Sequence, residues 1–300
     1  MEQTSKEVLV HLIAHPHRRY NPLSGQWVLV SPHRSKRPWQ GQAEDNEHRP
    51  QASHDPTCYL CPRNERMGGQ HNPDYAGCHV FANDFPALLT DSPPAENNDH
   101  PLLRHQSVRG LSRVICYSEN HSLTLPQLSV AKIVGIIDTW TEQATTLGER
   151  YRWVQLFENK GAMMGCSQPH PHGQVWASDF LPNEIERKDQ HLREYWQKQH
   201  SNLLLDYAKL EVASGERVVV KTKHWIVVVP CWAVWPFETM LLPLDAVSRF
   251  DALSSEQSED LALALKELTT RYDNLFQTSF PYSMGWHYAP YGGEADEASQ

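Results

Sequence analysis

An order of elements that occurs twice along the chain is the strongest constraint on its fold. In the first half, strand-like runs at residues 79–84 and 113–118 precede a helical pattern. In the second half, strand-like runs at residues 224–230 and 239–243 precede another. Two copies of strand, turn, strand and helix predict an antiparallel α+β protein with a continuous sheet.

Start signals mark the two clearest helices. Apolar residues from Val130 onward follow helical spacing behind Ser129, and a second helix follows Ser254 and Gln257, which form a possible capping box. A third, polar helix is expected over residues 183–200. The other expected elements are strands at 26–31, 153–159 and 218–223 and long loops at 40–75 and 90–105.

The composition is that of a globular protein and excludes two kinds of partner. With 300 residues and 40% apolar content, the chain can bury a substantial core. Its net charge of -9 is spread along the sequence and no basic cluster is interleaved with aromatic residues, so we expect no nucleic-acid partner. No apolar run approaches the roughly 18 residues of a membrane span. His11 interrupts the N-terminal apolar stretch and no cleavage site follows it, so we expect a cytoplasmic location.

Cys58 and Cys61 are the one close pair among six cysteines. In a cytosolic chain a C-x-x-C pair indicates metal or redox chemistry, and the polar, proline-rich surroundings disfavour redox chemistry. A tetrahedral zinc site needs two more ligands. His170 or His172 can supply one, and His121, in a polar turn, the other. The alternative is a pair of loop thiols without metal.

The segment CSQPHPHGQVW places His170, His172 and Gln174 two residues apart. In an extended segment these three side chains project from one face. The glycine-containing run 159–168 before them can offer backbone N–H groups to an anion. A histidine beside a metal-held neighbour suits nucleophilic attack on phosphorus, and an amide can hold phosphoryl oxygens without adding negative charge. The alternative is a set of solvent-facing histidines in a chain that contains 17 of them.

Longer stretches, among them CYLC, VFANDFPAL, FENKGAMMGCSQPHPHGQVWA and WPFETMLLP, closely resemble the galactose-1-phosphate uridylyltransferase family. This family is the branch of the histidine-triad superfamily whose last triad position is glutamine. The resemblance runs from about His15 to Pro290 and implies duplicated histidine-triad-like halves, which form a continuous antiparallel half-barrel flanked by helices. Within a single unit of residues 1–300, we expect an N-terminal half at 15–180, with the zinc site and nucleophile, and a shortened C-terminal half at 181–300.

The resemblance also implies a ping-pong reaction. His172 would attack the α-phosphorus of UDP-glucose, release glucose 1-phosphate and form a uridylyl-histidine. Galactose 1-phosphate would then take the UMP group and leave as UDP-galactose, while Gln174 steadies the phosphoryl oxygens. The zinc ligands implied by the family are Cys58, Cys61, His121 and His170.

Nucleotide binding and dimerisation are implied by further matched positions. Arg34 and Arg37 match a segment that in the family reaches across a homodimer to the neighbouring subunit's nucleotide. A guanidinium suits that role because it binds phosphate through paired hydrogen bonds. The implied uridine nucleotide contacts are Asn83, Asp84, Asn159, Gly165, Cys166, Ser167 and Gln174.

The chain departs from the family at a second metal site, which is often iron. That site typically uses a glutamate, the histidine matching His287 and a C-terminal histidine pair. Here Lys188 stands at the glutamate position, and the sequence ends at Gln300 before such a pair. A cation repels a metal, so we expect this second site to be absent, without replacement by Glu184 or Glu186.

Two other functions remain open at this point. One is a nucleotidyl hydrolase or phosphorylase of the same superfamily, although Gln174 in place of a third histidine disfavours hydrolysis. The other is a catalytically impaired, zinc-stabilised dimer that binds a sugar nucleotide, as the shortened C-terminal half suggests.

Overall fold

The computed structural model describes residues 14–36, 52–96 and 98–292. Arg37, one of the expected nucleotide contacts, lies outside them. The strands are β1 (His17–Asn21), β2 (Gln26–Val30), β3 (His79–Ala82), β4 (Gly110–Cys116), β5 (Trp153–Lys160), β6 (His172–Ser178), β7 (Val218–Lys221), β8 (Trp225–Val228), β9 (Met240–Pro243) and β10 (Tyr282–Gly285). The helices are α2 (Val130–Gly148), α3 (Asn183–Gln199), α4 (Leu203–Ser214) and α5 (Ser255–Phe276), with 3-10 turns η1 (Pro32–Lys36), η2 (Leu125–Gln127), η3 (Ala162–Met164) and η4 (Phe250–Ala252).

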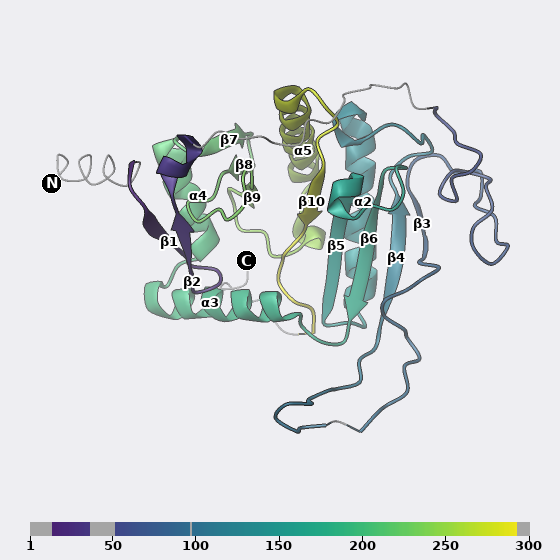
Figure 1. The fold of residues 1–300 in the computed structure, drawn as a ribbon, viewed down its shortest axis with the longest axis horizontal. Helices are drawn as coiled ribbons and strands as arrows, with labels where there is room; N and C mark the ends of the chain where they lie inside the picture. Colours follow the sequence, from purple (N-terminus) through teal and green to yellow (C-terminus); the bar gives the residue numbers. More distant parts are fainter. Residues whose placement is uncertain (1–13, 37–51, 97, 293–300) are drawn as a thin grey trace.

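An antiparallel sheet in the order β10-β5-β6-β4-β3 carries the candidate site. Side chains on β5 and β6 alternate between its faces, and Leu156 and Val175 on one face are fully buried. Helix α2 covers this face and contributes Ile137 to the same core (Figure 1). On the other face Gln174 is half-buried and Trp176 is exposed. The sheet therefore has one dry face and one face that a ligand can approach.

Both long helices begin where their capping residues predict. The hydroxyl of Ser129 accepts a hydrogen bond from the third backbone N–H of α2, and Ser254 with Gln257 forms the reciprocal capping box of α5. The two helices pack against each other. The ammonium of Lys266 on α5 also donates to two backbone carbonyls just before α2, at 2.7 and 2.5 Å. These contacts join the helix of the second half to the helix of the first.

The second half repeats the pattern on a smaller scale. Strands β7, β8 and β9 form an antiparallel sheet, against which α5 and α4 pack. The expected α+β class with antiparallel sheets flanked by helices is confirmed. The continuous sheet is not observed, since the described strands are hydrogen-bonded in three sheets. The sheets are separate because α5 lies between β9 and β10 in the chain. Strand β10 pairs with β5 of the first half instead of extending the sheet of β7, β8 and β9 (Figure 1).

The main element that the sequence did not predict is α4. It begins at Asn202, whose side-chain oxygen accepts hydrogen bonds from the N–H groups of Leu204 and Leu205, both at 3.0 Å. It ends at Gly215, which has a φ of 67°. Strands β1 and β10 had been assigned no element in advance, whereas β6 continues the segment around His172 and Gln174 that was expected to be extended.

None of the described helices is long and apolar enough to cross a membrane. The cytoplasmic location expected from the sequence stays a prediction.

A buried carboxyl group lies on the dry face of the sheet. Glu158 on β5 is 4% exposed and accepts a hydrogen bond of 3.0 Å from the hydroxyl of Tyr282 on β10. Burial raises the pKa of Glu158 to about 7, against an ordinary value of 4.5, although Tyr282, Lys160 and Tyr117 act to lower it. Because the folded-state pKa is the higher one, the stabilising contribution of this group is complete below pH 4.5 and is lost as the pH rises through about 7.

We therefore expect the Glu158→Gln substitution to change how stability depends on pH. The amide has no proton to lose, so the free energy of unfolding of the variant relative to the wild type rises between about pH 5 and about pH 8, by about 3 kcal/mol at most. Urea unfolding across this pH range measures the difference. Glu259→Gln, at an exposed position on α5, controls for the loss of one charge. A difference that is the same at every pH contradicts the expectation.

Candidate active site and metal site

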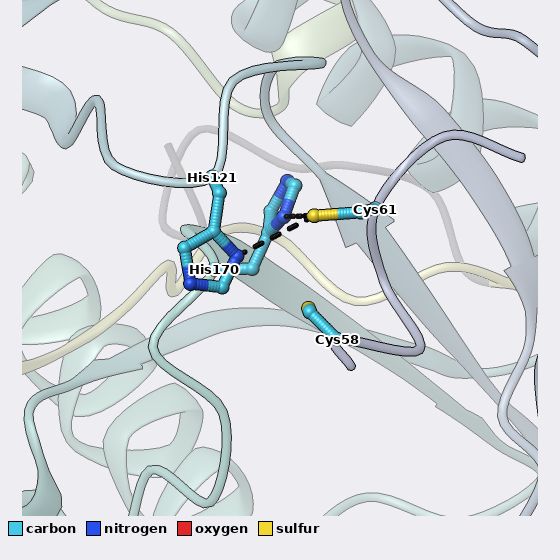
Figure 2. Close-up of side chains that lie close together, drawn as sticks. All are labelled: Cys58, Cys61, His121 and His170. Carbon is cyan, nitrogen blue, oxygen red and sulfur yellow. Dashed lines mark hydrogen bonds between the residues drawn. The ribbon is translucent and has the colours of Figure 1, made fainter. Parts of the chain in front are cut away.

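Two cysteines and two histidines converge at one end of the sheet. The ligand atoms of Cys58, Cys61, His121 and His170 all lie within 4.8 Å of one another, and all four residues are buried (Figure 2). The Sγ atom of Cys61 lies 3.5 Å from Nδ1 of His121 and 3.5 Å from Nδ1 of His170. The structure thus brings together the four expected zinc ligands from a loop, a turn after β4 and the segment before β6.

The outer nitrogen of His170 has a hydrogen-bond partner, and that of His121 lies near a carboxylate. Nε2–H of His170 donates to the backbone carbonyl of Ser118 at 2.9 Å, which leaves the lone pair of Nδ1 facing the thiols. Nε2 of His121 lies 4.0 Å from the carboxylate of Asp55. Burial lowers the pKa of His170 to about 4, so the ring is neutral near pH 7, as a metal ligand must be.

The thiols have surroundings that suit thiolates only in the presence of a cation. Backbone N–H groups of Leu60 and Asp55 point at Sγ of Cys58 and Cys61, at 3.4 and 3.5 Å. Burial nevertheless raises the pKa of the Cys58 thiol to about 11. Two thiols and two imidazoles form the donor set of a tetrahedral zinc site, and a divalent cation offsets the cost of burying thiolates. The four residues therefore fit a zinc ion.

His172 is the first residue of β6 and is held by its neighbour in the chain. Its Nδ1–H donates to the backbone carbonyl of His170 at 2.7 Å, so Nε2 carries the free lone pair. Burial lowers the pKa of His172, which favours the neutral ring. The residue lines a cavity of about 250 Å³. These are the properties of a nucleophile that is unprotonated and fixed in direction.

A glycine-punctuated loop forms much of this cavity. Gly161 and Gly165 flank η3 with φ values of 90° and 79°, a region that favours glycine. They turn the chain back so that Cys166 and Ser167 line the cavity beside His172. Thr124, Lys160 and residues 168–171 complete its wall together with Glu158, Asn159 and Ala162.

Some of the predicted nucleotide contacts lie at the same end of the sheet as His172. Asn159, Cys166 and Ser167 line the cavity, whereas Gly165 is exposed on the loop and Gln174 lies further along β6, on the same face as His172. His170 precedes β6 and turns its ring into the metal cluster, so the expected shared face holds for the other two members of the trio.

Two further predicted contacts follow β3 directly. Asn83 accepts a hydrogen bond from the N–H of Phe85 at 2.9 Å, and Asp84 lies 3.7 Å from the guanidinium of Arg66. Arg34, on η1, is exposed, and no described contact joins it to the cavity. Arg66 was not identified from the sequence, because a single arginine in a polar loop carries no motif.

Gly173 sits between His172 and Gln174 of β6 because no larger residue fits there. A Cβ atom at this position would lie 2.3 Å from the hydroxyl oxygen of Tyr117 and 3.2 Å from the carbonyl oxygen of Phe157. Tyr117 is itself 1% exposed and packs beside Trp140 of α2, so it has no room to retreat. The close approach explains why a glycine follows the second histidine.

Comparisons with known proteins agree with this picture. Residues 7–182 match the family model "Galactose-1-phosphate uridyl transferase, N-terminal domain", and residues 186–300 match the corresponding C-terminal domain. The chain is 60% identical to galactose-1-phosphate uridylyltransferase of Haemophilus influenzae over 94% of this chain and 81% of that protein. It is 51% identical to the rat enzyme of the same name over 93% of this chain and 73% of that protein.

Solved structures show the same architecture. A structure described as that of a uridylyltransferase aligns with a TM-score of 0.70 at 26% identity, over 92% of this chain and 81% of that one. An ADP-glucose phosphorylase from Arabidopsis thaliana, with bound ADP-glucose, aligns with a TM-score of 0.71 at 23% identity, over 92% of this chain and 82% of that one, and shows the fold alone. The class defined by these likenesses and by the site is that of the nucleotidyltransferases. Within that class, the chain belongs to the galactose-1-phosphate uridylyltransferase family.

We expect the Cys61→Ser substitution to remove bound metal, because Cys61 contacts both histidines of the cluster. Metal analysis of the purified protein should give about one zinc per wild-type chain and well under half of that for the variant. Cys231→Ser, a cysteine outside the cluster, is the matched control and should keep its zinc. Retention of a full equivalent of zinc by Cys61→Ser would sink the metal assignment.

We also expect Gly173→Ala to destabilise the end of β6 and to abolish most activity, since the added methyl group collides with Tyr117. The expected loss in the free energy of unfolding is about 1–3 kcal/mol. Adding Tyr117→Phe removes the atom at 2.3 Å and should restore part of the stability. Gly135→Ala on α2 is the control: its Cβ meets nothing within 4 Å, so the variant should be as stable as the wild type or more so.

Proposed function

We propose that the protein transfers UMP from UDP-glucose to galactose 1-phosphate by a ping-pong reaction through a uridylyl group on His172. The observation that supports this most directly is the 2.7 Å hydrogen bond from Nδ1–H of His172 to the carbonyl of His170. It leaves Nε2 as an unprotonated nucleophile in a residue that lines the cavity. Relatives at 60% and 51% identity carry the name of this activity.

The first half-reaction forms a P–N bond. Nε2 of His172 attacks the α-phosphorus of UDP-glucose, and the bond from that phosphorus to the bridging oxygen breaks, which releases glucose 1-phosphate. The imidazole becomes positively charged as it is uridylylated. The carbonyl of His170 stabilises that charge because it accepts the hydrogen bond that Nδ1–H of His172 donates at 2.7 Å.

The second half-reaction reverses the chemistry with another acceptor. A phosphate oxygen of galactose 1-phosphate attacks the same phosphorus, the P–N bond breaks, and UDP-galactose leaves with His172 restored as the neutral imidazole. The side-chain amide of Gln174 holds the non-bridging oxygens in both steps. An amide adds no negative charge beside the phosphoryl group and is a poor proton donor, which favours transfer to a sugar phosphate over hydrolysis.

The uridine nucleotide is held by the two groups of residues described above. The loop residues Gly165, Cys166 and Ser167 and the neighbouring Asn159 surround the phosphoryl end, and Asn83 with Asp84 binds the nucleoside end. Arg34, with Arg37 from outside the described residues, contributes to the nucleotide site of a second subunit in a homodimer. The exposed position of Arg34 supports such a role.

A zinc ion is the cation that the Cys58, Cys61, His121 and His170 cluster best accommodates. When bound, it crosslinks the C-x-x-C loop to the segment before β6. His170 then serves twice, through its ring as a ligand and through its carbonyl as the partner of His172. This makes the metal a structural support for the nucleophile.

We propose no second metal ion at Lys188 and His287. The ammonium of Lys188 donates to Nδ1 of His287 at 2.6 Å, so it occupies one of the two ring nitrogens and places a positive charge where a metal ion would bind. Burial and the charge of Lys188 lower the pKa of His287 to about 4, so the imidazole stays a neutral acceptor near pH 7. The metal analysis described above should find one equivalent of metal per chain if this is correct.

We likewise propose a division into halves at residues 15–180 and 181–300.

A nucleotidyl phosphorylase or hydrolase is the second candidate. The fold of the ADP-glucose phosphorylase supports it, since the same architecture serves a different acceptor. A catalytically impaired protein that binds a sugar nucleotide is the third. The identity of the acceptor molecule distinguishes the first two candidate functions from each other. A covalent intermediate distinguishes both of them from the third candidate function.

We expect UDP-glucose labelled with ³²P in the α-phosphate to leave an acid-labile label on His172. Galactose 1-phosphate should remove the label as UDP-galactose, whereas water and inorganic phosphate should not. His172→Ala should take up no label and keep its zinc, because His172 is outside the metal cluster. His71→Ala, at an exposed site, is the matched control. Release of the label by phosphate or water instead of galactose 1-phosphate supports the second candidate, and UDP-glucose binding without any label supports the third.

A further inference from the structure

Arg66 is a buried cation outside the reaction centre for which the chemistry described above has no use. Its side chain is 10% exposed, although it belongs to the polar loop that follows the C-x-x-C pair. Its Nε–H group is buried and has no hydrogen-bond partner among the residues that the structure describes. An arginine is expensive to bury, so its position needs a reason.

The contacts of Arg66 hold it against the end of β3. Its guanidinium carbon lies 4.1 Å from the centre of the Phe81 ring. One terminal nitrogen is fixed in direction because it donates a hydrogen bond to the side-chain oxygen of Gln70 at 2.5 Å. The same nitrogen lies 3.7 Å from the carboxylate of Asp84, whose side chain is 17% exposed. Arg66 is therefore fixed by three neighbours, and the carboxylate is one of them.

The register of the sheet places Asp84 near the strand that carries the candidate site. Asp84 follows β3, and Phe81 of β3, against which Arg66 packs, pairs with Val114 of β4. Val114 in turn pairs with Gln174 of β6, the strand that begins at His172. The Arg66–Asp84 pair thus lies at the end of a strand two positions away from β6 in the same sheet.

A carboxylate beside a nucleotide site poses an electrostatic problem. It accepts hydrogen bonds only, so toward UDP-glucose it can bind the ribose hydroxyl groups or the N3–H of uracil. Its charge also repels the two phosphates of the same ligand. A buried guanidinium next to it offsets that charge and holds the carboxylate in one direction, which allows it to accept hydrogen bonds from an anionic ligand.

We infer that Arg66 is a positioning residue for nucleotide binding, which acts through the carboxylate of Asp84. The inference rests on the proposed function, because it takes UDP-glucose as the ligand. It assigns to the loop after the C-x-x-C pair a part in substrate affinity as well as in metal binding. Arg66 contacts neither the phosphorus nor His172. Its loss should therefore raise the concentration of UDP-glucose needed for half-saturation without changing the rate of the chemical step.

The test is the rate of uridylyl-enzyme formation, followed by rapid quench at increasing concentrations of UDP-glucose. In Arg66→Met the half-saturating concentration should rise about ten- to a hundredfold, the effect of losing one charged interaction in a partly buried site. The maximal rate should stay within about threefold of the wild type. Arg66→Lys keeps the charge without the planar fork and should fall between the two. Arg63→Gln, in the same loop but in an exposed ion pair with Asp74, is the matched control.

A double-mutant cycle shows whether Arg66 acts through Asp84. Asp84→Asn alone should also raise the half-saturating concentration, and adding Arg66→Met to it should cost much less than it does in the wild type. Full additivity of the two substitutions overturns the inference. An unchanged half-saturating concentration in Arg66→Met, or a loss confined to the maximal rate, overturns it as well.

The zinc content and thermal unfolding of each variant distinguish a folding defect from a loss of affinity for UDP-glucose. If Arg66→Met does not fold, Gln70→Ala decides the matter, because it removes the 2.5 Å hydrogen bond to Arg66 from an exposed position. It should raise the half-saturating concentration several-fold, and wild-type behaviour of a folded Gln70→Ala then counts against the inference. Absence of any uridylyl-enzyme in the wild type would instead refute the proposed function.

Discussion

The hydrogen bond from His172 to the backbone carbonyl of His170 is the interaction on which the candidate site depends. It joins the candidate metal cluster to the proposed nucleophile through a single peptide unit, because the ring of His170 faces the thiols while its carbonyl faces the next histidine. Pro171 between them restricts the backbone, and Gly173 after them lets Tyr117 support the strand from the dry side. Two histidines two residues apart can therefore have different roles: the ring of His170 lies in the candidate metal cluster, and the ring of His172 is held by the carbonyl of His170.

The chemistry-bearing residues of the site could be predicted because their types and spacing are themselves constrained. A C-x-x-C pair in these surroundings indicates a metal site with further ligands, and an extended H-x-H-x-Q segment presents alternate residues on one face. Cys58, Cys61, His170 and His172 could therefore be identified as candidates. The supporting residues could not be found in this way. Ser118 contributes a backbone carbonyl, and Arg66 meets Phe81 and Asp84 only in the folded loop. Nothing in a single sequence marks such contacts.

The fold could be predicted where local signals were strong. The prediction failed where strand pairing is decided by long-range contacts. The caps at Ser129 and Ser254 specify helix starts within a few residues, and both were correct. Helix α4 has apolar side chains spread around its axis, because it packs on one sheet with Ala208 and on the N-terminal hairpin region with Leu203, so its periodicity is weak. The division into separate sheets could not be foreseen either, since a strand's partner is chosen by tertiary packing and not by the strand's own residues.

The pairing of β10 with β5 has a consequence for the order in which the protein is made. Strand β5 is complete by residue 160, yet the strand that covers its edge begins at Tyr282. On a ribosome, the half that carries both histidines therefore emerges with an open strand edge in the sheet that holds the candidate site. Such an edge can pair with other chains until the last described strand arrives. The nascent first half depends for its protection on residues that are translated more than a hundred positions later, so chaperone demand should be concentrated in that interval.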